Sequence, residues 1–301
     1  MRRLRLPLLN AIVLALTACS ILKVAYSNVD LYLRWKADDY FALDSQQRGL
    51  VKAQLDATTT WHRSEELPRY TDLLHAAQDR VARGLDSEDM EWFYQSVRMR
   101  YEALARQSAP GAAEVLSTLT PAQIAHFEAK LERENERFAV EFVERPPDLQ
   151  RRERFKRSLN LMEEWVGPLS EAQRARMEGL SFQIPLTNGY RLEDRQRRQR
   201  ALLAILKRHR PADALAPRLE AWLIEWDKGR STEYQRSAEE ARRQTVAMLV
   251  ELDRMLEREQ RVHLESKLAR YAAEFQSLAG DGSPRASVMT LPEGWLLAYA
   301  H

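Results

Sequence analysis

Apolar residues recur three and four positions apart along most of this chain, and no stretch alternates apolar and polar residues for long enough to indicate a strand. The first clear helix start is Asp44, a residue type that caps helices, with Gln47 three residues later as in a capping box. Apolar residues at helical spacing follow, which predicts a long helix towards Gly84 with a bend near Pro68. The pattern therefore predicts an all-α fold.

Caps, prolines and glycines divide the rest of the chain into further helices. Pro110 is the expected end of the second helix, and the last helix is the longest because it contains no internal glycine or proline. The expected helices cover 86–109, 120–145, 148–166, 170–181, 191–208, 212–228 and 231–278. With the helix from Asp44, they predict an extended bundle of about seven to nine amphipathic helices with a long C-terminal helix.

One short phrase, a leucine followed four residues later by a glutamine, recurs at helix starts. It occurs at Leu43–Gln47, Leu119–Gln123, Leu169–Gln173 and Leu256–Gln260, with leucines 76, 50 and 87 residues apart, which excludes a repeat of fixed period. A cap followed by a glutamine is a common way to begin a helix, and we favour that interpretation. Because Glu257 in the last phrase is a poor cap, we expect the C-terminal helix to continue through it.

The first residues have the pattern of a secretory signal. Positive residues within the first five precede an apolar stretch over 6–18, which is shorter than a membrane-spanning helix requires. The stretch ends in Leu16-Thr17-Ala18-Cys19, which is similar to the lipobox of bacterial lipoproteins. This resemblance implies cleavage between Ala18 and Cys19, and a diacylglyceryl group and palmitate on Cys19. By the same resemblance, Ser20 implies anchorage in the outer membrane, facing the periplasm.

Cys19 is the only cysteine in the chain, so an intramolecular disulfide is excluded and burial must stabilise the fold. The glycine-rich break at Gly280–Gly282 separates the last helix from a tail that we expect to be loose. The predicted organisation is a signal peptide over 1–18, a lipidated N-terminus with a short helical lead-in over 19–42, a helical body over 43–280 and a flexible tail over 281–301.

The charge balance narrows the possible partners. The whole chain has a formal net charge of +2, which includes three arginines of the predicted signal, so the mature chain is close to neutral. Export and near neutrality argue against nucleic acid as a partner. No nucleophile motif such as G-x-S-x-G and no phosphate-binding glycine loop occurs, so the sequence indicates no cofactor, no small-molecule substrate and no enzyme activity.

Positive charge gathers in one segment, with 16 Lys and Arg against 8 Asp and Glu between Arg145 and Arg210. Arg191, Arg195 and Arg198 fall on one face of a predicted helix and are the candidate interaction residues. They would suit anionic lipid headgroups, lipopolysaccharide phosphates or an acidic protein. A solvated face, paired with acidic helices of the same molecule, is the interpretation that we favour.

Two further groups carry possible chemistry. His62 and Glu66 lie one helical turn apart, as metal ligands do, and Glu259 and His263 form a second such pair, but a third ligand is missing from both. We expect no metal site and favour a structural hydrogen bond from His62 to a carboxylate. Trp222 and Trp226, also one turn apart, indicate core packing more than a groove for client proteins.

Two family resemblances bear on function. Asp38–Arg48 and Trp61–Tyr70, in this order after a lipobox, resemble a family of uncharacterised Gram-negative lipoproteins of unknown function, which implies a helical lipoprotein body and brings no activity. Leu119–Gln123 is similar to the L-T-x-x-Q motif of Spy- and CpxP-type periplasmic chaperones, whose apolar surfaces hold unfolded clients.

Three classes of function remain open from the sequence. The first is a lipid-anchored protein with a non-catalytic, protein-binding or chaperone-like role in the cell envelope. The second is a structural or assembly lipoprotein with a dedicated envelope partner. The third, an enzyme or metal protein that uses His62 and Glu66, ranks well below the other two.

Overall fold

The computed structural model describes residues 21–208 and 211–280, and all of their regular structure is helical, so the predicted all-α fold is confirmed. Eleven α-helices lie in these residues, more than expected, because 21–41 forms a full helix, a π-helical turn separates α3 from α4, and the stretch over 231–278 is divided. They are α2 (Ile21–Phe41), α3 (Ser45–Trp61), α4 (Leu67–Arg83), α5 (Ser87–Leu116), α6 (Pro121–Phe138), α7 (Pro147–Val166), α8 (Glu171–Gln183), α9 (Asn188–Leu206), α10 (Ala212–Ile224), α11 (Thr232–Met255) and α12 (Arg258–Gly280). Two π-helical turns, η1 (His62–Glu66) and η2 (Ala139–Val143), follow α3 and α6.

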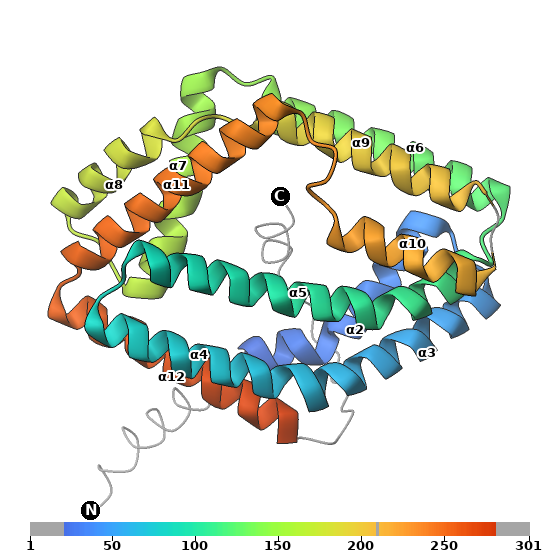
Figure 1. Ribbon diagram of the computed structural model, residues 1–301, viewed down its shortest axis with the longest axis horizontal. Coiled ribbons are helices and arrows are strands. Elements are labelled where there is room, and N and C mark those ends of the chain that lie inside the picture. The colour runs from blue at the N-terminus through green and yellow to red at the C-terminus, as the bar shows by residue number, and fades with distance from the viewer. Residues whose placement is uncertain (1–20, 209–210, 281–301) are drawn as a thin grey trace, which may run out of the picture.

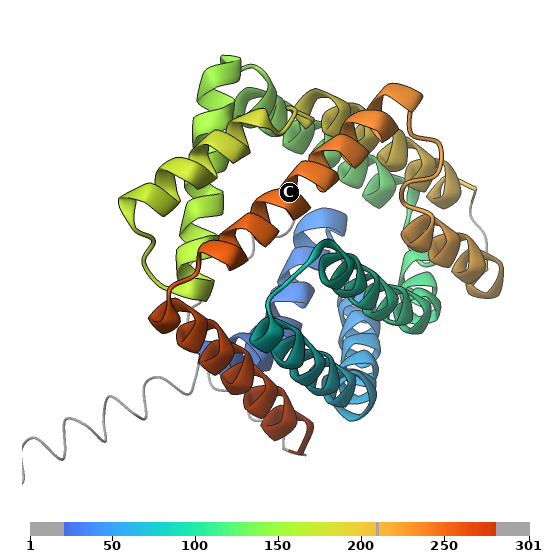
Figure 2. The same cartoon turned by 60° about the vertical axis from the view of Figure 1, so that its left-hand side comes forward.

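The long helices are arranged as the sides of a frame (Figures 1 and 2). In Figure 1, α6 and α9 lie side by side along the top, and α4 and α12 lie side by side along the bottom. Helix α5 crosses the middle, where its C-terminal half packs against α10. Segments far apart in the chain are therefore neighbours, and α12 closes the frame by packing on α4.

Most helices begin where the sequence predicts them to begin. Asp44, Asp86, Thr120 and Ser170 each accept a hydrogen bond from the backbone N–H three residues later, and each is completed as a capping box. These bonds satisfy backbone donors that the first turn of a helix leaves without an intrahelical partner. At the other end, Gly84 has a φ of +87°, a backbone conformation that a glycine adopts without steric cost.

Two predicted boundaries are wrong. Helix α5 does not stop before Pro110 but continues to Leu116. The proline ring lies on the exposed side, while Ala109 and Ala113 beside it are fully buried against Leu215 and its neighbours in α10. This packing holds the helix together despite the backbone hydrogen bond that a proline cannot make. The helix from 44 to 84 is continuous, as predicted, but its irregularity is the turn η1, immediately before Pro68.

The second error is the uninterrupted helix over 231–278, which the chain divides at Leu256 into α11 and α12. Leu256 is extended, with a ψ of 127°. Although Glu257 is a poor cap, its backbone N–H donates to the side-chain oxygen of Gln260 at 3.0 Å. The fourth leucine–glutamine phrase is therefore a true helix start, like the other three.

The four phrases join in two pairs, which we call the first and second paired turns. In the first, the side-chain amides of Gln47 and Gln123 donate to each other at 3.1 and 2.6 Å. In the second, Gln173 and Gln260 do the same at 2.8 and 3.0 Å. Each amide also donates to the carbonyl immediately before the leucine of the opposite phrase, at Thr118, Ala42, Met255 and Pro168.

These bonds use the whole hydrogen-bonding capacity of each glutamine side chain. The oxygen accepts from the backbone of its own turn and from its partner, and the amide nitrogen donates to its partner and to a carbonyl. A buried polar group that is fully satisfied in this way fixes a unique arrangement of the elements that carry it. The four phrases therefore hold together, in pairs, helix starts that are 76 and 87 residues apart in the sequence.

Each paired turn lies in its own apolar core. The first core surrounds Leu43 and Leu119 and includes Val51, Ile124, Phe127 and Leu203. The second surrounds Leu169 and includes Met162, Met177, Met248 and Leu252. The paired turns thus organise the two ends of the frame, and α4 with α12 and α5 with α10 connect them.

Candidate interaction site

The predicted cleavage site at Ala18, the predicted lipidated Cys19 and the C-terminal tail lie outside the described residues. None of the helices between 21 and 280 that the structure describes is both long and apolar enough to cross a membrane. The interaction residues predicted on α9 are all described.

The three candidate arginines of α9 have different partners. Arg195 donates to Glu134 at 3.1 Å and to Asn135 at 2.9 Å, both on α6. Arg198 stacks on the indole of Trp222 at 4.7 Å and donates to the Trp222 carbonyl at 3.4 Å. Arg191 packs over the ring of Phe138 at 5.8 Å and forms no ion pair with any described residue. Two of the three arginines on the predicted basic face, Arg195 and Arg198, are therefore bound by other residues of the same molecule.

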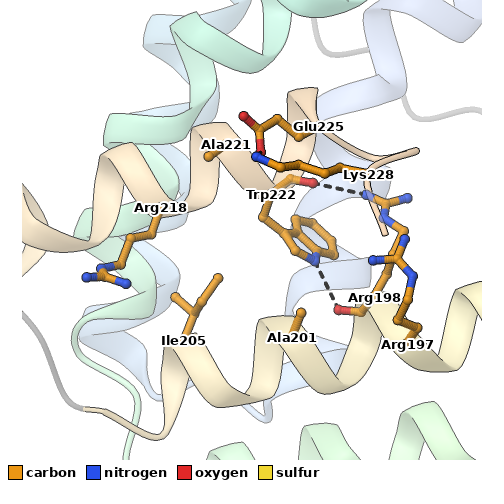
Figure 3. Close-up of a pocket in the computed structure, with 9 residues that line it drawn as sticks. All are labelled: Arg197, Arg198, Ala201, Ile205, Arg218, Ala221, Trp222, Glu225 and Lys228. Atoms are coloured by element: carbon orange, nitrogen blue, oxygen red, sulfur yellow. Dashed lines mark hydrogen bonds and ion pairs between the residues drawn. The ribbon is translucent and has the colours of Figure 1, made fainter. Parts of the chain in front are cut away.

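A shallow groove lies between α9 and α10, with a volume of about 310 Å³. Figure 3 shows the Trp222 indole between the two helices, with Arg197 and Arg198 from α9 and Lys228 and Glu225 beside it. The indole N–H donates to the Arg198 carbonyl at 3.0 Å. The lining combines four cationic side chains, including Arg218, with one carboxylate, so the groove suits a negatively charged group attached to an apolar body.

The end of α10 explains why arginines gather there. The carbonyls of a helix C-terminus lack intrahelical donors and carry partial negative charge. Arg198 donates to the Trp222 carbonyl, Arg197 to the Trp226 carbonyl at 3.4 Å, and the Tyr101 hydroxyl to the Leu223 carbonyl at 2.9 Å. Part of the basic face therefore closes this helix end.

The two tryptophans are not the core residues that their spacing suggests. Trp222 lines the groove, and Trp226 lies under the guanidinium of Arg230 at 4.5 Å. The residue of this segment that is buried in the core is Leu219, which packs against α5.

An exposed apolar row on α5 is the feature that the sequence analysis did not single out. Every fourth residue from Asp89 to Ala113 falls on one row of this helix. Ala105, Ala109 and Ala113 are buried, the last two against α10, whereas Phe93, Val97 and Tyr101 are 41%, 46% and 39% exposed. Small residues occupy the covered half and large ones the uncovered half. We call Phe93, Tyr94, Val97 and Tyr101 the α5 stripe.

Polar groups border both ends of the stripe. At one end the guanidinium of Arg242, on α11, lies 5.7 Å from the Tyr94 ring and forms an ion pair with Glu91. At the other end the Tyr101 hydroxyl reaches the last turn of α10. Burial raises the pKa of Tyr101, and the charge of Arg198 partly offsets this. An apolar patch with a polar border is typical of an interaction site.

We expected His62 to form a hydrogen bond with a carboxylate, and this prediction is wrong. The imidazole lies between two tyrosine hydroxyls instead. Its Nδ1 is 2.9 Å from the Tyr26 hydroxyl on α2, and its Nε2 is 3.3 Å from the Tyr70 hydroxyl. Burial lowers the pKa of His62, although the carboxylate of Glu66 opposes the effect. Burial also raises the pKa of Tyr70 to about 12. The imidazole thus connects α2 to the body.

Glu66 is fully buried at the end of η1 and is neutralised by arginines, with Arg69 at 2.7 Å and Arg100 at 3.4 Å. His62 and Glu66 therefore have separate partners and do not converge on a common point. Glu259 and His263 are both exposed on α12. Among residues 21–208 and 211–280, no group of three His, Cys, Asp or Glu side chains is placed to hold a metal ion.

Comparison with known proteins places the chain in a family without assigning an activity. The model of a family of unknown function, DUF6279, matches residues 39–235, which is well over half of the chain. No curated protein and no solved structure matches it significantly. The match includes the first paired turn, the α5 stripe and the groove beside Trp222, and the chain therefore belongs to the DUF6279 family of unknown function.

Proposed function

We propose that this protein is a lipid-anchored, non-catalytic binding protein of the cell envelope that holds partly unfolded polypeptide segments on the α5 stripe in a chaperone-like role. The observation that carries the proposal is the contrast along one row of α5. Alanines stand where α10 covers the row, whereas the large side chains Phe93, Val97 and Tyr101 remain 39–46% exposed.

The size of the exposed residues supports a binding role. A solvent-facing helix position has no need of phenylalanine, valine or tyrosine, and burying each such side chain contributes about 1.5–3 kcal/mol. Three of them in one row therefore offer a partner a continuous apolar surface. A segment seated on the stripe would continue from the point where α10 ends.

The surrounding charge indicates which segments would fit best. Arg242 lies at one end of the stripe, and Tyr101 at the other end contacts α10, whose Trp222 lines the basic groove. We expect the preferred clients to combine apolar residues with a nearby acidic one, because the cations would complement a carboxylate.

The membrane anchor is part of the proposal and rests on the sequence Leu16–Cys19. Several acyl chains on one cysteine give stable attachment, since each buried methylene contributes about 0.8 kcal/mol. Labelling cells with a palmitate analogue should mark the native chain and not the Cys19→Ser variant. A native chain that fractionates with soluble periplasmic proteins and carries no label would contradict the anchor.

The binding role is tested with the chain from Ser20 onward, added at substoichiometric ratio to a denatured test protein while light scattering reports aggregation. Suppressed scattering that survives moderate salt supports apolar client binding, because salt screens charge interactions and leaves apolar ones. Unchanged scattering at equal stoichiometry contradicts the role. A structural or assembly lipoprotein with one dedicated envelope partner would then be the better account, and crosslinking in intact cells would identify that partner.

A further inference from the structure

Three arginines converge on a pair of phenylalanines where α6, η2, α7 and α9 meet. The guanidinium carbon of Arg157 lies 5.4 Å from the ring centroid of Phe142. Those of Arg191 and Arg195 lie 5.8 and 5.9 Å from the ring centroid of Phe138. The two rings are 5.0 Å apart, so the three positive groups share one apolar support.

Among the described residues, a counter-ion is present for Arg195 and for neither of the other two. Arg195 is held by Glu134 and Asn135. Among the residues that the structure describes, neither Arg157 nor Arg191 has a carboxylate or carbonyl partner, although Glu153 and Glu193 lie on the same helices. Arg174, by contrast, forms an ion pair with Glu163 at 2.7 Å.

A fourth arginine adds to the uncompensated charge. Arg154, one turn before Arg157, donates to the carbonyls of Ser181, Ile184 and Pro185 at 2.6, 3.0 and 3.2 Å and has no carboxylate partner. Burial lowers the pKa of Arg154, and the charges of Arg151 and Arg157 lower it further. The same holds for the pKa of Arg191, which burial and the charges of Arg157 and Arg195 lower while Tyr234 opposes them.

We infer that Arg157 and Arg191 form a binding site for an oxyanion of the phosphate class, with Arg195 fixed beside them and the Phe138–Phe142 pair as its apolar floor. A planar guanidinium matches the oxygens of a phosphate in two parallel hydrogen bonds, and an apolar support strengthens such bonds by excluding water. A bound phosphate would supply the counter-charge that the residues over 21–208 and 211–280 do not provide. This site is independent of the α5 stripe.

The phosphate can belong to a dissolved phosphate compound or to a lipid headgroup. Val140 in η2, the turn that carries Phe142, is 61% exposed, and Leu149 in the first turn of α7, the helix that carries Arg157, is 39% exposed, so exposed apolar side chains lie on the elements that form the site. The experiment therefore needs one arm for each source.

In the first arm, the chain from Ser20 onward is titrated with inorganic phosphate and with pyrophosphate by calorimetry. In the second, it is sedimented with vesicles of phosphatidylglycerol and with vesicles of phosphatidylcholine. Arg157→Gln and Arg191→Gln are the test variants. Arg152→Gln on α7 and Arg200→Gln on α9 are matched controls, because both arginines, like Arg157, are exposed and form no ion pair with a described residue, but neither is placed over Phe138 or Phe142.

We expect binding in at least one arm, weakened roughly tenfold or more by either test variant and unchanged in the controls, since each test variant removes charge-assisted hydrogen bonds to the bound anion. Binding of dissolved phosphate or pyrophosphate assigns the site to a soluble phosphate compound. Sedimentation with phosphatidylglycerol alone assigns it to a lipid headgroup.

A stability measurement separates this role from a structural one. Without ligand, Arg191→Gln should leave the thermal midpoint unchanged or raise it, because it removes a half-buried charge that has no counter-ion among the described residues. A lowered midpoint would indicate that Arg191 serves the fold. Absence of binding in both arms, or equal losses in the control variants, would overturn the proposal.

Discussion

The first paired turn, around Gln47 and Gln123, and the second, around Gln173 and Gln260, share the same set of hydrogen bonds but differ in their surroundings. Both glutamines of the second are buried, whereas Gln123 in the first is partly exposed. The first turn contains a strained residue, Ala42, with a φ of +48°, and the second contains the uncapped start at Glu257. Because both turns share the paired amides and differ in backbone conformation and capping, we infer that the amide pair determines how the turns are held together.

The largest effect should come from breaking the amide pair in the second turn. Gln173→Leu keeps the side-chain volume but leaves the Met255 carbonyl and the Ser170 N–H without these partners, and it removes both hydrogen bonds between the two side-chain amides. We expect a loss of about 2–4 kcal/mol in the free energy of unfolding, measured by urea denaturation. Gln95→Leu, at an exposed glutamine on α5, is the control and should cost little.

A double variant sharpens this test. Gln173→Leu with Gln260→Leu should cost less than the sum of the two single changes, because either single change already removes both hydrogen bonds between the two amides. Strict additivity would mean that the two side chains stabilise the turn separately. The equivalent change in the first turn, Gln123→Leu, should cost less than Gln173→Leu, since water can reach the partly exposed amide.

The strain in the first turn predicts a stabilising change of intermediate size. Ala42 has a left-handed backbone conformation in which its β-carbon is crowded, while its carbonyl accepts from Gln123. Ala42→Gly should raise the free energy of unfolding by about 1 kcal/mol, because glycine adopts this conformation without the steric cost. A decrease in stability would show that the turn is not strained.

The missing cap in the second turn predicts a somewhat smaller gain. Glu257→Ser places a hydroxyl where it can accept the backbone N–H of Gln260, as Ser170 accepts that of Gln173. We expect about 0.5–1 kcal/mol of added stability in the same denaturation assay. Ser170→Ala should cost a similar amount, and if both changes are neutral, capping does not contribute at these turns.

The smallest effect concerns pH, because the helices that enter the two turns are held differently. Helix α2 is held by Tyr26 and His62, whereas α7 is held by the ion pair of Glu164 and Lys267 at 2.9 Å. Since burial lowers the pKa of His62, the unfolded chain binds a proton at higher pH than the folded chain does. Stability should therefore fall as the pH drops through about 6.5, the ordinary value for histidine.

His62→Gln isolates this contribution. The amide cannot be protonated in this range, so the difference in unfolding free energy between about pH 7.5 and about pH 5.5 should be smaller in the variant than in the native chain. His126→Gln is the control, at an exposed histidine on α6 that contacts the Asp39 carbonyl. An equal pH dependence in native chain and His62→Gln would contradict the assignment.

Helix starts could be predicted from the sequence, whereas contacts between residues far apart in the chain could not. Asp44, Asp86, Thr120 and Ser170 marked their helix starts because capping depends on residues a few positions apart. The break at Leu256 was missed because it depends on Gln173, 87 residues before Gln260, and no local pattern reports that contact. The identical form of the four phrases was the available signal.

The same limit applies to the surfaces. Spacing placed Arg191, Arg195 and Arg198 on one face of α9, but their different roles are set by α6 and α10, which bring Glu134 to one arginine and Trp222 to another. The apolar spacing of Phe93, Val97 and Tyr101 predicted a helix, and only the position where α10 ends shows that these residues remain uncovered.

The most direct test of the proposed function compares Val97→Asp with Val262→Asp in the light-scattering assay. Both valines are exposed on helices, at 46% and 54%, and both variants gain the same charge, but only Val97 belongs to the α5 stripe. Substitution at exposed positions should change stability by less than about 0.5 kcal/mol. The account predicts that Val97→Asp loses most of the suppression of aggregation while Val262→Asp retains it. Equal activity of the two variants would contradict the placement of client binding on α5.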